Sequence, residues 1–84
     1  MPSTTQATAI ETTVYAALEN FGAKADEITR EATWDDIDVD SLDLAELAQV
    51  VEDAHGVKME DEDMKQVKTV GDAIDYITAK KEAA

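Results

Sequence analysis

The stretch Asp40–Gly56 reads DSLDLAELAQVVEDAHG, and it decides the fold of this chain. Asp40 is a favoured N-cap residue, and Asp43 stands three positions later, where a capping-box partner belongs. Gly56 is the residue type that most often ends a helix. The sequence therefore predicts an amphipathic helix from Asp40 to Gly56. Its inward-facing stripe is expected to contain Leu44, Leu47, Val51 and Ala54.

Three further segments show helical patterns on either side of this stretch. Residues 5–20 have apolar residues at helical spacing and are followed by Gly22. Residues 61–67 allow one or two helical turns, and residues 70–80 follow a cap pair, Thr69 with Asp72. The sequence thus predicts an all-α fold, a small four-helix bundle with three longer, nearly aligned helices and one short helix.

A long first loop, residues 22–39, separates the first two helices and has no sustained period. Isolated large apolar residues within it are expected to pin the loop to the core, with Trp34 packing inside the loop. Residues 57–59 are predicted to form a short buried segment. The predicted core consists of Ile10, Val14, Leu18, Phe21, Ile28, Leu44, Leu47, Val51, Val57, Val70, Ile74 and Ile77.

The length of 84 residues predicts one domain, residues 1–84, with an ordered core of about 5–80 and frayed termini. Because the chain starts at Met1, we expect it to be a complete product. A domain of this size has little room for a deep active site. The absence of cysteine excludes a disulfide, a zinc–thiolate site and a catalytic thiol from the chain itself. The chain has no signal-peptide pattern and no apolar run that could span a bilayer, so we expect a cytoplasmic protein.

Charge is the dominant feature of the composition. Twenty acidic residues against seven basic ones give a net charge of −13, and twelve of the acids lie between Asp35 and Asp63, where Lys58 is the one base. Such a surface repels nucleic acid and anionic lipid and attracts basic protein partners. Because 44% of the residues are apolar and clearly periodic, the acidity does not indicate disorder.

The segment Asp40-Ser41-Leu42-Asp43 places a serine at the start of the second helix, directly after the long loop. The tripeptide Asp-Ser-Leu is a weak signal, because short motifs occur by chance. On its own it is better explained by a helix cap that has no further role.

The wider context resembles the acyl carrier protein family over residues 10–78. The stretches that carry the resemblance are Asp36–Asp43 (DIDVDSLD), Val57–Glu62 (VKMEDE) and Thr69–Ile77 (TVGDAIDYI), in the order of the family. Two positions depart from the family pattern: Asp38 stands where a glycine is common, and Glu60 where a proline is common. These departures put the geometry of the loops in question.

The resemblance implies that Ser41 carries a 4′-phosphopantetheine arm, bordered by Asp40 and Leu42. The thiol of this arm would hold acyl groups as thioesters, which fits a chain that has no thiol of its own. A phosphopantetheinyl transferase would load the arm, and a ketosynthase and an acyltransferase would use it. The chain itself would not be an enzyme. We expect a monomer.

Acidic residues of the second helix are the expected docking surface for basic partner enzymes. These residues are Asp43, Glu46, Glu52 and Asp53. We expect Leu42 to be exposed beside Ser41 and to add an apolar contact. Gln49 stands where many carriers expose an apolar residue, so the choice of partner is expected to differ. The sequence leaves open whether the pathway makes fatty acids or polyketides.

Two other classes of function remain open. Asp36, Asp38 and Asp40 follow the alternate spacing of a calcium-binding EF-hand loop, but Ser41 replaces its glycine and Leu47 its final glutamate. A cofactor-free acidic adaptor would explain the charge but not the position of Ser41. Catalysis by Ser41 and His55 is disfavoured, because fourteen helical positions separate them by about 21 Å.

Overall fold

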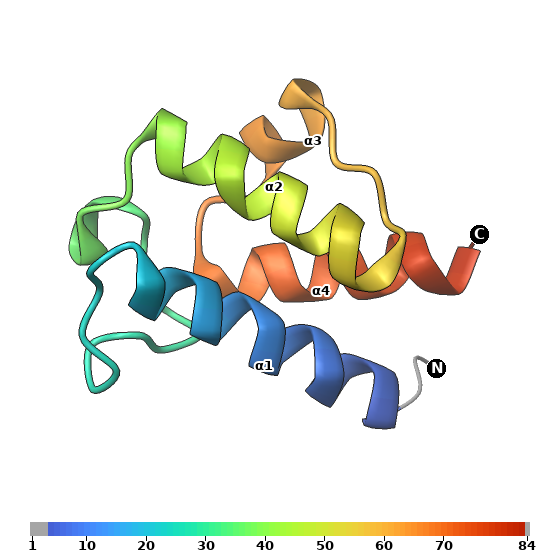
Figure 1. Cartoon of the computed structure of the whole chain (residues 1–84), viewed down its shortest axis with the longest axis horizontal. Helices are drawn as coiled ribbons and strands as arrows, with labels where there is room; N and C mark the ends of the chain where they lie inside the picture. The colour runs from blue at the N-terminus through green and yellow to red at the C-terminus, as the bar shows by residue number, and fades with distance from the viewer. Residues whose placement is uncertain (1–3, 84) are drawn as a thin grey trace.

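The computed structural model describes residues 4–83, and in this part of the chain all regular elements are helical. In Figure 1, α2 and α4 run in the same direction and α1 runs opposite to both. The first loop lies at one end of the molecule, and the start of α1 and the end of α4 lie at the other (Figure 1). The elements are α1 (Thr4–Asn20), the 3-10 turn η1 (Asp35–Ile37), α2 (Ser41–His55), α3 (Asp61–Gln66) and α4 (Val70–Ala83).

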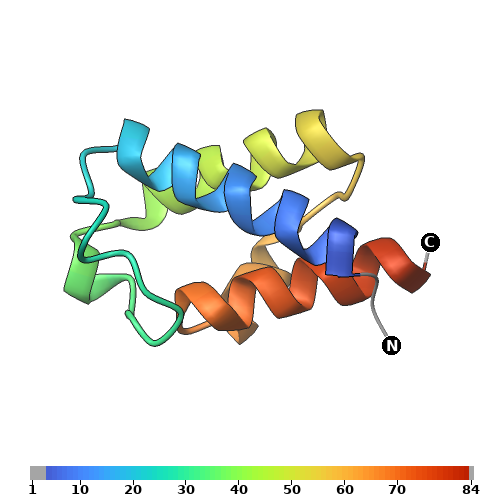
Figure 2. The same cartoon turned by 90° about the horizontal axis from the view of Figure 1, so that it is seen from below.

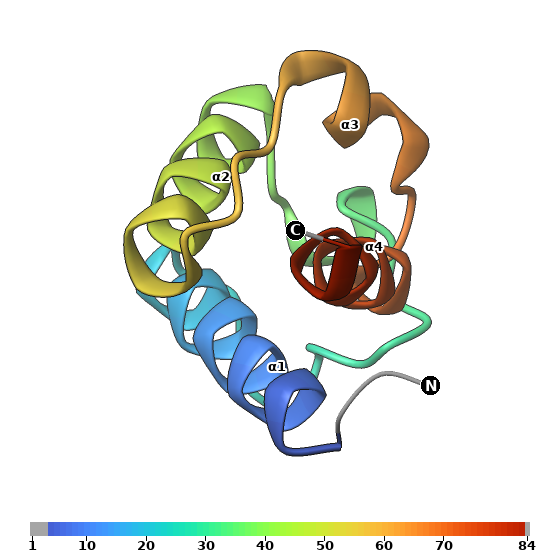
Figure 3. The same ribbon diagram turned by 90° about the vertical axis from the view of Figure 1, so that its right-hand side faces the viewer.

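The helices form the expected bundle of three longer helices and one short helix. α1 packs against both α2 and α4. The view along the bundle in Figure 3 shows α3 lying across the top, between α2 and α4, and Figure 2 shows α1 beside both long partners. The all-α four-helix prediction is therefore confirmed. No helix among residues 4–83 combines the length and the apolar character needed to cross a membrane.

Helix boundaries agree with the sequence prediction except at the end of α4. This helix continues to Ala83, so Lys80 and Lys81 lie in its last turn and not in a frayed tail. Two cations at a helix C-terminus interact favourably with the helix dipole, which supports the extra turn. We expected frayed termini on both sides of residues 5–80, but Thr4 and residues 81–83 are helical, and residues 1–3 and 84 lie outside the described part of the chain.

Both glycine stops have the left-handed backbone that ends a helix. After α1, Gly22 has φ 106°, and the N–H of Ala23 reaches back to the carbonyl of Leu18 at 3.1 Å. After α2, Gly56 has φ 70° and donates its N–H to the carbonyl of Glu52 at 2.9 Å. Because a side chain is strained in this region, glycine at these two positions sets where the helices end.

The core is continuous and contains most of the predicted residues, with three corrections. Phe21 and Leu44 are only half-buried. Ala54 is exposed, because in the last turn of α2 it is His55 that contacts α1, through Thr13. The burial of Met59 agrees with the predicted buried segment, and that of Trp34 and Ile37 agrees with the predicted anchoring of the first loop. Buried apolar residues that the prediction did not include are Ala32, Val39, Val67 and Ala73.

The first loop is fixed to the start of α4 by backbone contacts. The indole N–H of Trp34 donates to the carbonyl of Val67 at 3.1 Å, which confirms that Trp34 packs within the structure. The N–H of Val70 donates to the carbonyl of Ala32 at 3.0 Å, and the N–H of Gly71 donates to the carbonyl of Arg30 at 2.8 Å. The loop that precedes α2 is therefore anchored along its second half.

A polar cluster around Asp63 attaches α3 to α4. Its carboxylate accepts hydrogen bonds from the backbone N–H of Glu60 at 2.9 Å, the Lys80 ammonium at 2.7 Å and the Tyr76 hydroxyl. The Lys80 ammonium also donates to the carbonyl of Lys58 at 2.7 Å. These contacts, led by the backbone N–H of Glu60, lower the pKa of Asp63 from 3.8 to about 2.

Replacing Asp63 by asparagine is expected to lower the free energy of unfolding at neutral pH by about 1–2 kcal/mol, because charge-assisted hydrogen bonds are lost. Since the folded-state pKa is depressed, the contribution of Asp63 is present above 3.8 and is lost as the pH falls toward about 2. Urea unfolding at a series of pH values should show the free energies of unfolding of the wild type and Asp63→Asn converging in that window. Glu62→Gln, an exposed change on the same helix, is the control and should differ little from wild type at neutral pH. A constant difference across the window would contradict the assignment.

Candidate functional site

Ser41 is the first residue of α2 and is exposed. The cap of this helix is formed by its two neighbours: the N–H of Asp43 donates to the Asp40 carboxylate at 3.0 Å, and the N–H of Asp40 donates to the Asp43 carboxylate at 3.5 Å. This reciprocal capping box confirms the predicted helix start. Because the cap is formed without the Ser41 side chain, its hydroxyl stands at the open end of the helix.

The backbone that leads into Ser41 turns sharply at Asp38. Its φ of 55° and ψ of 39° lie in the left-handed region, and it is the one non-glycine residue with positive φ among residues 4–83. Asp and Asn tolerate this conformation better than most residues, and glycine adopts it without strain. The departure at Asp38 therefore leaves the loop in a geometry that glycine would also adopt.

Replacing Asp38 by glycine is expected to raise the free energy of unfolding by about 0.5–1 kcal/mol, because it removes the strain of a left-handed side chain. Thermal and urea unfolding would measure the gain. Asp35→Gly is the matched control, since it removes the same charge from the neighbouring 3-10 turn, and it should not stabilise the protein. Equal effects of the two variants would mean that relief of acidic repulsion, and not backbone strain, is responsible.

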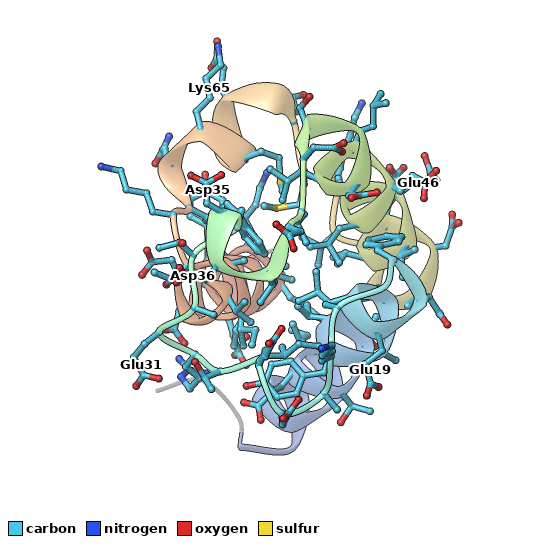
Figure 4. The ribbon with its side chains drawn as sticks, turned by 90° about the vertical axis from the view of Figure 1, so that its left-hand side faces the viewer. Glu19, Glu31, Asp35, Asp36, Glu46 and Lys65 are labelled. Carbon is cyan, nitrogen blue, oxygen red and sulfur yellow. The ribbon has the colours of Figure 1, made fainter. Side chains whose placement is uncertain are left out.

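The outward face of α2 brings together Ser41, Leu42 and three of the predicted docking acids. Leu42 is 76% exposed and is the one large apolar residue so exposed in the described part of the chain. Glu46, Glu52 and Asp53 are exposed on the same helix. Figure 4, which views the molecule from the end that carries the first loop, shows Glu46 directed away from α2 and Asp35 and Asp36 on the loop.

Two residues of the predicted docking surface have local partners. Asp43 is half-buried and its carboxylate belongs to the cap of α2, so it is less available to a partner than Glu46. The Gln49 amide donates to the Asp53 carboxylate at 3.0 Å. Gln49 therefore makes the middle of this face polar, one turn before Asp53.

A groove of about 640 Å³ runs between α2 and α3 and begins at Ser41. We call it the α2/α3 groove. Ala45 is exposed and Ala48 is half-buried, and both border the groove. Their small side chains leave open space where larger ones would fill it. The remaining lining residues are Leu44, Gln49, Glu52, Met59, Met64 and Lys65.

His55 lies at the far end of α2 and has a structural environment. Its Nε2 is 2.8 Å from the Thr13 hydroxyl, and the Lys81 ammonium donates to its carbonyl at 2.7 Å. Burial, with a smaller contribution from Lys81, lowers the pKa of His55. These surroundings favour the neutral ring. Since it terminates the helix that Ser41 begins, the two residues do not form a catalytic pair.

The aspartates that follow EF-hand spacing have separate local roles. Asp36 accepts a hydrogen bond from the N–H of Thr33 at 3.0 Å, which lowers the pKa of Asp36. Asp38 forms the left-handed turn, and Asp40 caps α2. Among the side chains that the structure describes, no three acidic, histidine or cysteine groups converge in a way that could hold a metal ion.

The fold and the site define a small helical module that presents one serine hydroxyl beside an open groove. The family model for the phosphopantetheine attachment site matches residues 16–77, which is well over half of the chain. The chain belongs to this family, and it is a phosphopantetheine-carrying carrier protein. The predicted resemblance to acyl carrier proteins agrees with this result.

The residues present fit the 4′-phosphopantetheine group that this family carries. The group is joined to a serine through a phosphodiester, and Ser41 offers an exposed hydroxyl. Unpaired N–H groups and the positive end of the dipole at a helix N-terminus favour a phosphate, although Asp40 and Asp43 oppose it. The adjoining groove offers apolar surface from Leu44, which lies within the matched range.

Proposed function

We propose that this chain is a free-standing acyl carrier protein in which Ser41 bears the phosphopantetheine arm. The carrier would present acyl intermediates to the enzymes of a type II polyketide or fatty-acid synthase. Residues 1–84 would form one carrier domain, with Asp40 and Leu42 bordering the point of attachment. The chain would catalyse no step itself.

The observation that carries this proposal is the exposed hydroxyl of Ser41 at the N-terminus of α2, inside the range that matches the family. A transferase must reach this oxygen, and no described side chain covers Ser41 enough to bury it. Leu42, beside it, gives a partner an apolar contact. The capped helix and the hydrogen-bonded loop place Ser41 at this end of α2.

The role of the protein in this proposal is tethering and recognition. When bound, the group supplies a terminal thiol that holds acyl chains as thioesters. The α2 surface docks the carrier onto a partner, and docking then gives the partner a high effective concentration of its substrate. The apolar part of the α2/α3 groove would offer shelter to the arm between encounters.

Intact-mass measurement tests the proposal directly. The purified protein is incubated with coenzyme A and a broad-specificity phosphopantetheinyl transferase, and the modified peptide is then located by fragmentation. The proposal requires a gain of one phosphopantetheine group on the peptide that contains Ser41. A stoichiometric calcium site without such a gain would favour a calcium-binding module. If the protein neither gains mass nor binds calcium, an acidic adaptor is favoured.

The acidic face of α2 is expected to speed encounter with the transferase. Reversing one charge with Glu46→Lys should lower the rate constant for loading at low salt by about three- to tenfold, because attraction to a basic partner is weakened. The matched control is Glu19→Lys, an exposed charge reversal on α1 that changes the net charge equally. The difference between the variants should shrink at high salt. Equal losses would mean that overall charge, and not the face of α2, guides docking.

A further inference from the structure

Lys65 is the one basic residue that borders the α2/α3 groove. It lies on α3, while Ser41 borders the same groove from α2, so the two residues lie on opposite walls. In Figure 4, Lys65 extends outward from α3, at the rim of the molecule, and not toward the core. A long cationic side chain at this rim can turn toward a group held in the groove.

Lys65 takes part in none of the ion pairs found between described side chains. Three such pairs join Arg30 to Glu11, Arg30 to Asp75, and Lys80 to Asp63. Near Ser41, the carboxylates of Asp40 and Asp43 would repel an anionic phosphodiester. Along the groove, Glu52 would also repel it. Lys65 is thus the groove's single source of compensating charge.

We propose that Lys65 is a positioning residue for the prosthetic group. Its ammonium pairs with the anionic phosphodiester and holds the arm along the α2/α3 groove, against apolar surface from Ala48 and Met64. This inference rests on the proposed attachment at Ser41. An exposed ion pair is weak and screened by salt, so a partner with a basic surface competes with Lys65 for the phosphodiester. Docking then frees the arm from the groove.

Amide chemical shifts in the apo and holo proteins test this role without any synthase activity. Each variant is loaded with coenzyme A and a transferase, and intact mass confirms the loading. In the wild type, loading should shift the amides of Ala45, Ala48 and Met64 as well as those adjoining Ser41. In Lys65→Gln, the ratio of docked to free arm should fall about two- to fivefold, the range expected for one exposed ion pair. Glutamine and lysine have similar helix propensity, so α3 is retained.

Lys68→Gln is the matched control, because Lys68 is exposed two residues after α3 and does not border the groove. In Lys68→Gln, the loading-induced amide shifts of the groove residues should equal those of the wild type. Raising the salt concentration should bring the wild-type shifts closer to those of Lys65→Gln. If loaded Lys65→Gln keeps the wild-type groove shifts, or if wild-type shifts stay confined to the neighbours of Ser41, Lys65 does not position the arm. A wild-type protein that gains no mass would instead overturn the proposed function, and this inference with it.

Discussion

Replacing Ser41 by alanine is expected to abolish loading by a phosphopantetheinyl transferase. The change removes the oxygen to which the phosphodiester would be joined, so the expected loss is complete and not graded. Because Asp40 and Asp43 form the cap of α2 without the Ser41 side chain, the variant should keep its fold. Intact mass after incubation with coenzyme A measures the loss, and circular dichroism verifies the helical content.

Thr29→Ala is the matched control for this experiment. Thr29 has an exposed hydroxyl in the first loop, outside the N-terminus of any helix. This variant should gain the same mass as the wild type, because only a hydroxyl presented at the start of α2 fits the proposed attachment. Mass gain by folded Ser41→Ala would place the arm on another residue and would overturn the proposed role of Ser41.

Replacing Gly71 by alanine is expected to lower the free energy of unfolding by about 2–3 kcal/mol, as overpacking a tight contact does. A Cβ at this position would lie 2.8 Å from the carbonyl oxygen of Arg30 and 3.1 Å from its Cβ. The nearest atom belongs to the backbone, so it cannot move aside by a change of rotamer. Relief would require separating the first loop from the start of α4 and stretching the hydrogen bond from the N–H of Gly71 to Arg30. Urea unfolding measures the loss.

The control for Gly71→Ala is the opposite exchange at an exposed position of the same helix. Ala79→Gly should lower the stability by about 1 kcal/mol, because glycine has low helix propensity. Helix propensity alone would make Gly71→Ala stabilising. If both variants lower the stability, the loss in Gly71→Ala is therefore caused by the clash with Arg30. A gain in stability for Gly71→Ala would show that the contact between loop and helix relaxes at little cost.

The helices could be predicted from the sequence because their signals are local. The cap pair of Asp40 with Asp43 and the stop at Gly56 depend only on neighbouring residues, and the structure contains both. The course of the first loop could not be predicted, because it depends on contacts between distant residues, such as that of Trp34 with Val67. The burial of Val39 has the same origin.

The candidate site could be predicted only in part, because some of its features depend on local signals and others on long-range contacts. The position of Ser41 at a helix start follows from capping, whereas the groove beside it requires α3 to lie across the bundle. Ala45 and Ala48 gave a signal, since two small residues on one helix face leave room. This signal does not predict the groove on its own, because nothing in the local sequence says which helix will face those positions. The role of Lys65 depends on this same long-range arrangement.

Ser41 lies at one end of the bundle, and the start of α1 and the end of α4 lie at the other (Figure 1). This arrangement makes the molecule convenient to immobilise. The start of α1 and the end of α4 lie far from the loop that leads into α2 (Figure 1). A surface anchor, a fluorophore or a fused protein joined through the end of α4 would project away from the serine hydroxyl. The end of α4 is therefore a suitable attachment point for single-molecule or biosensor experiments in which the serine hydroxyl must face the solution.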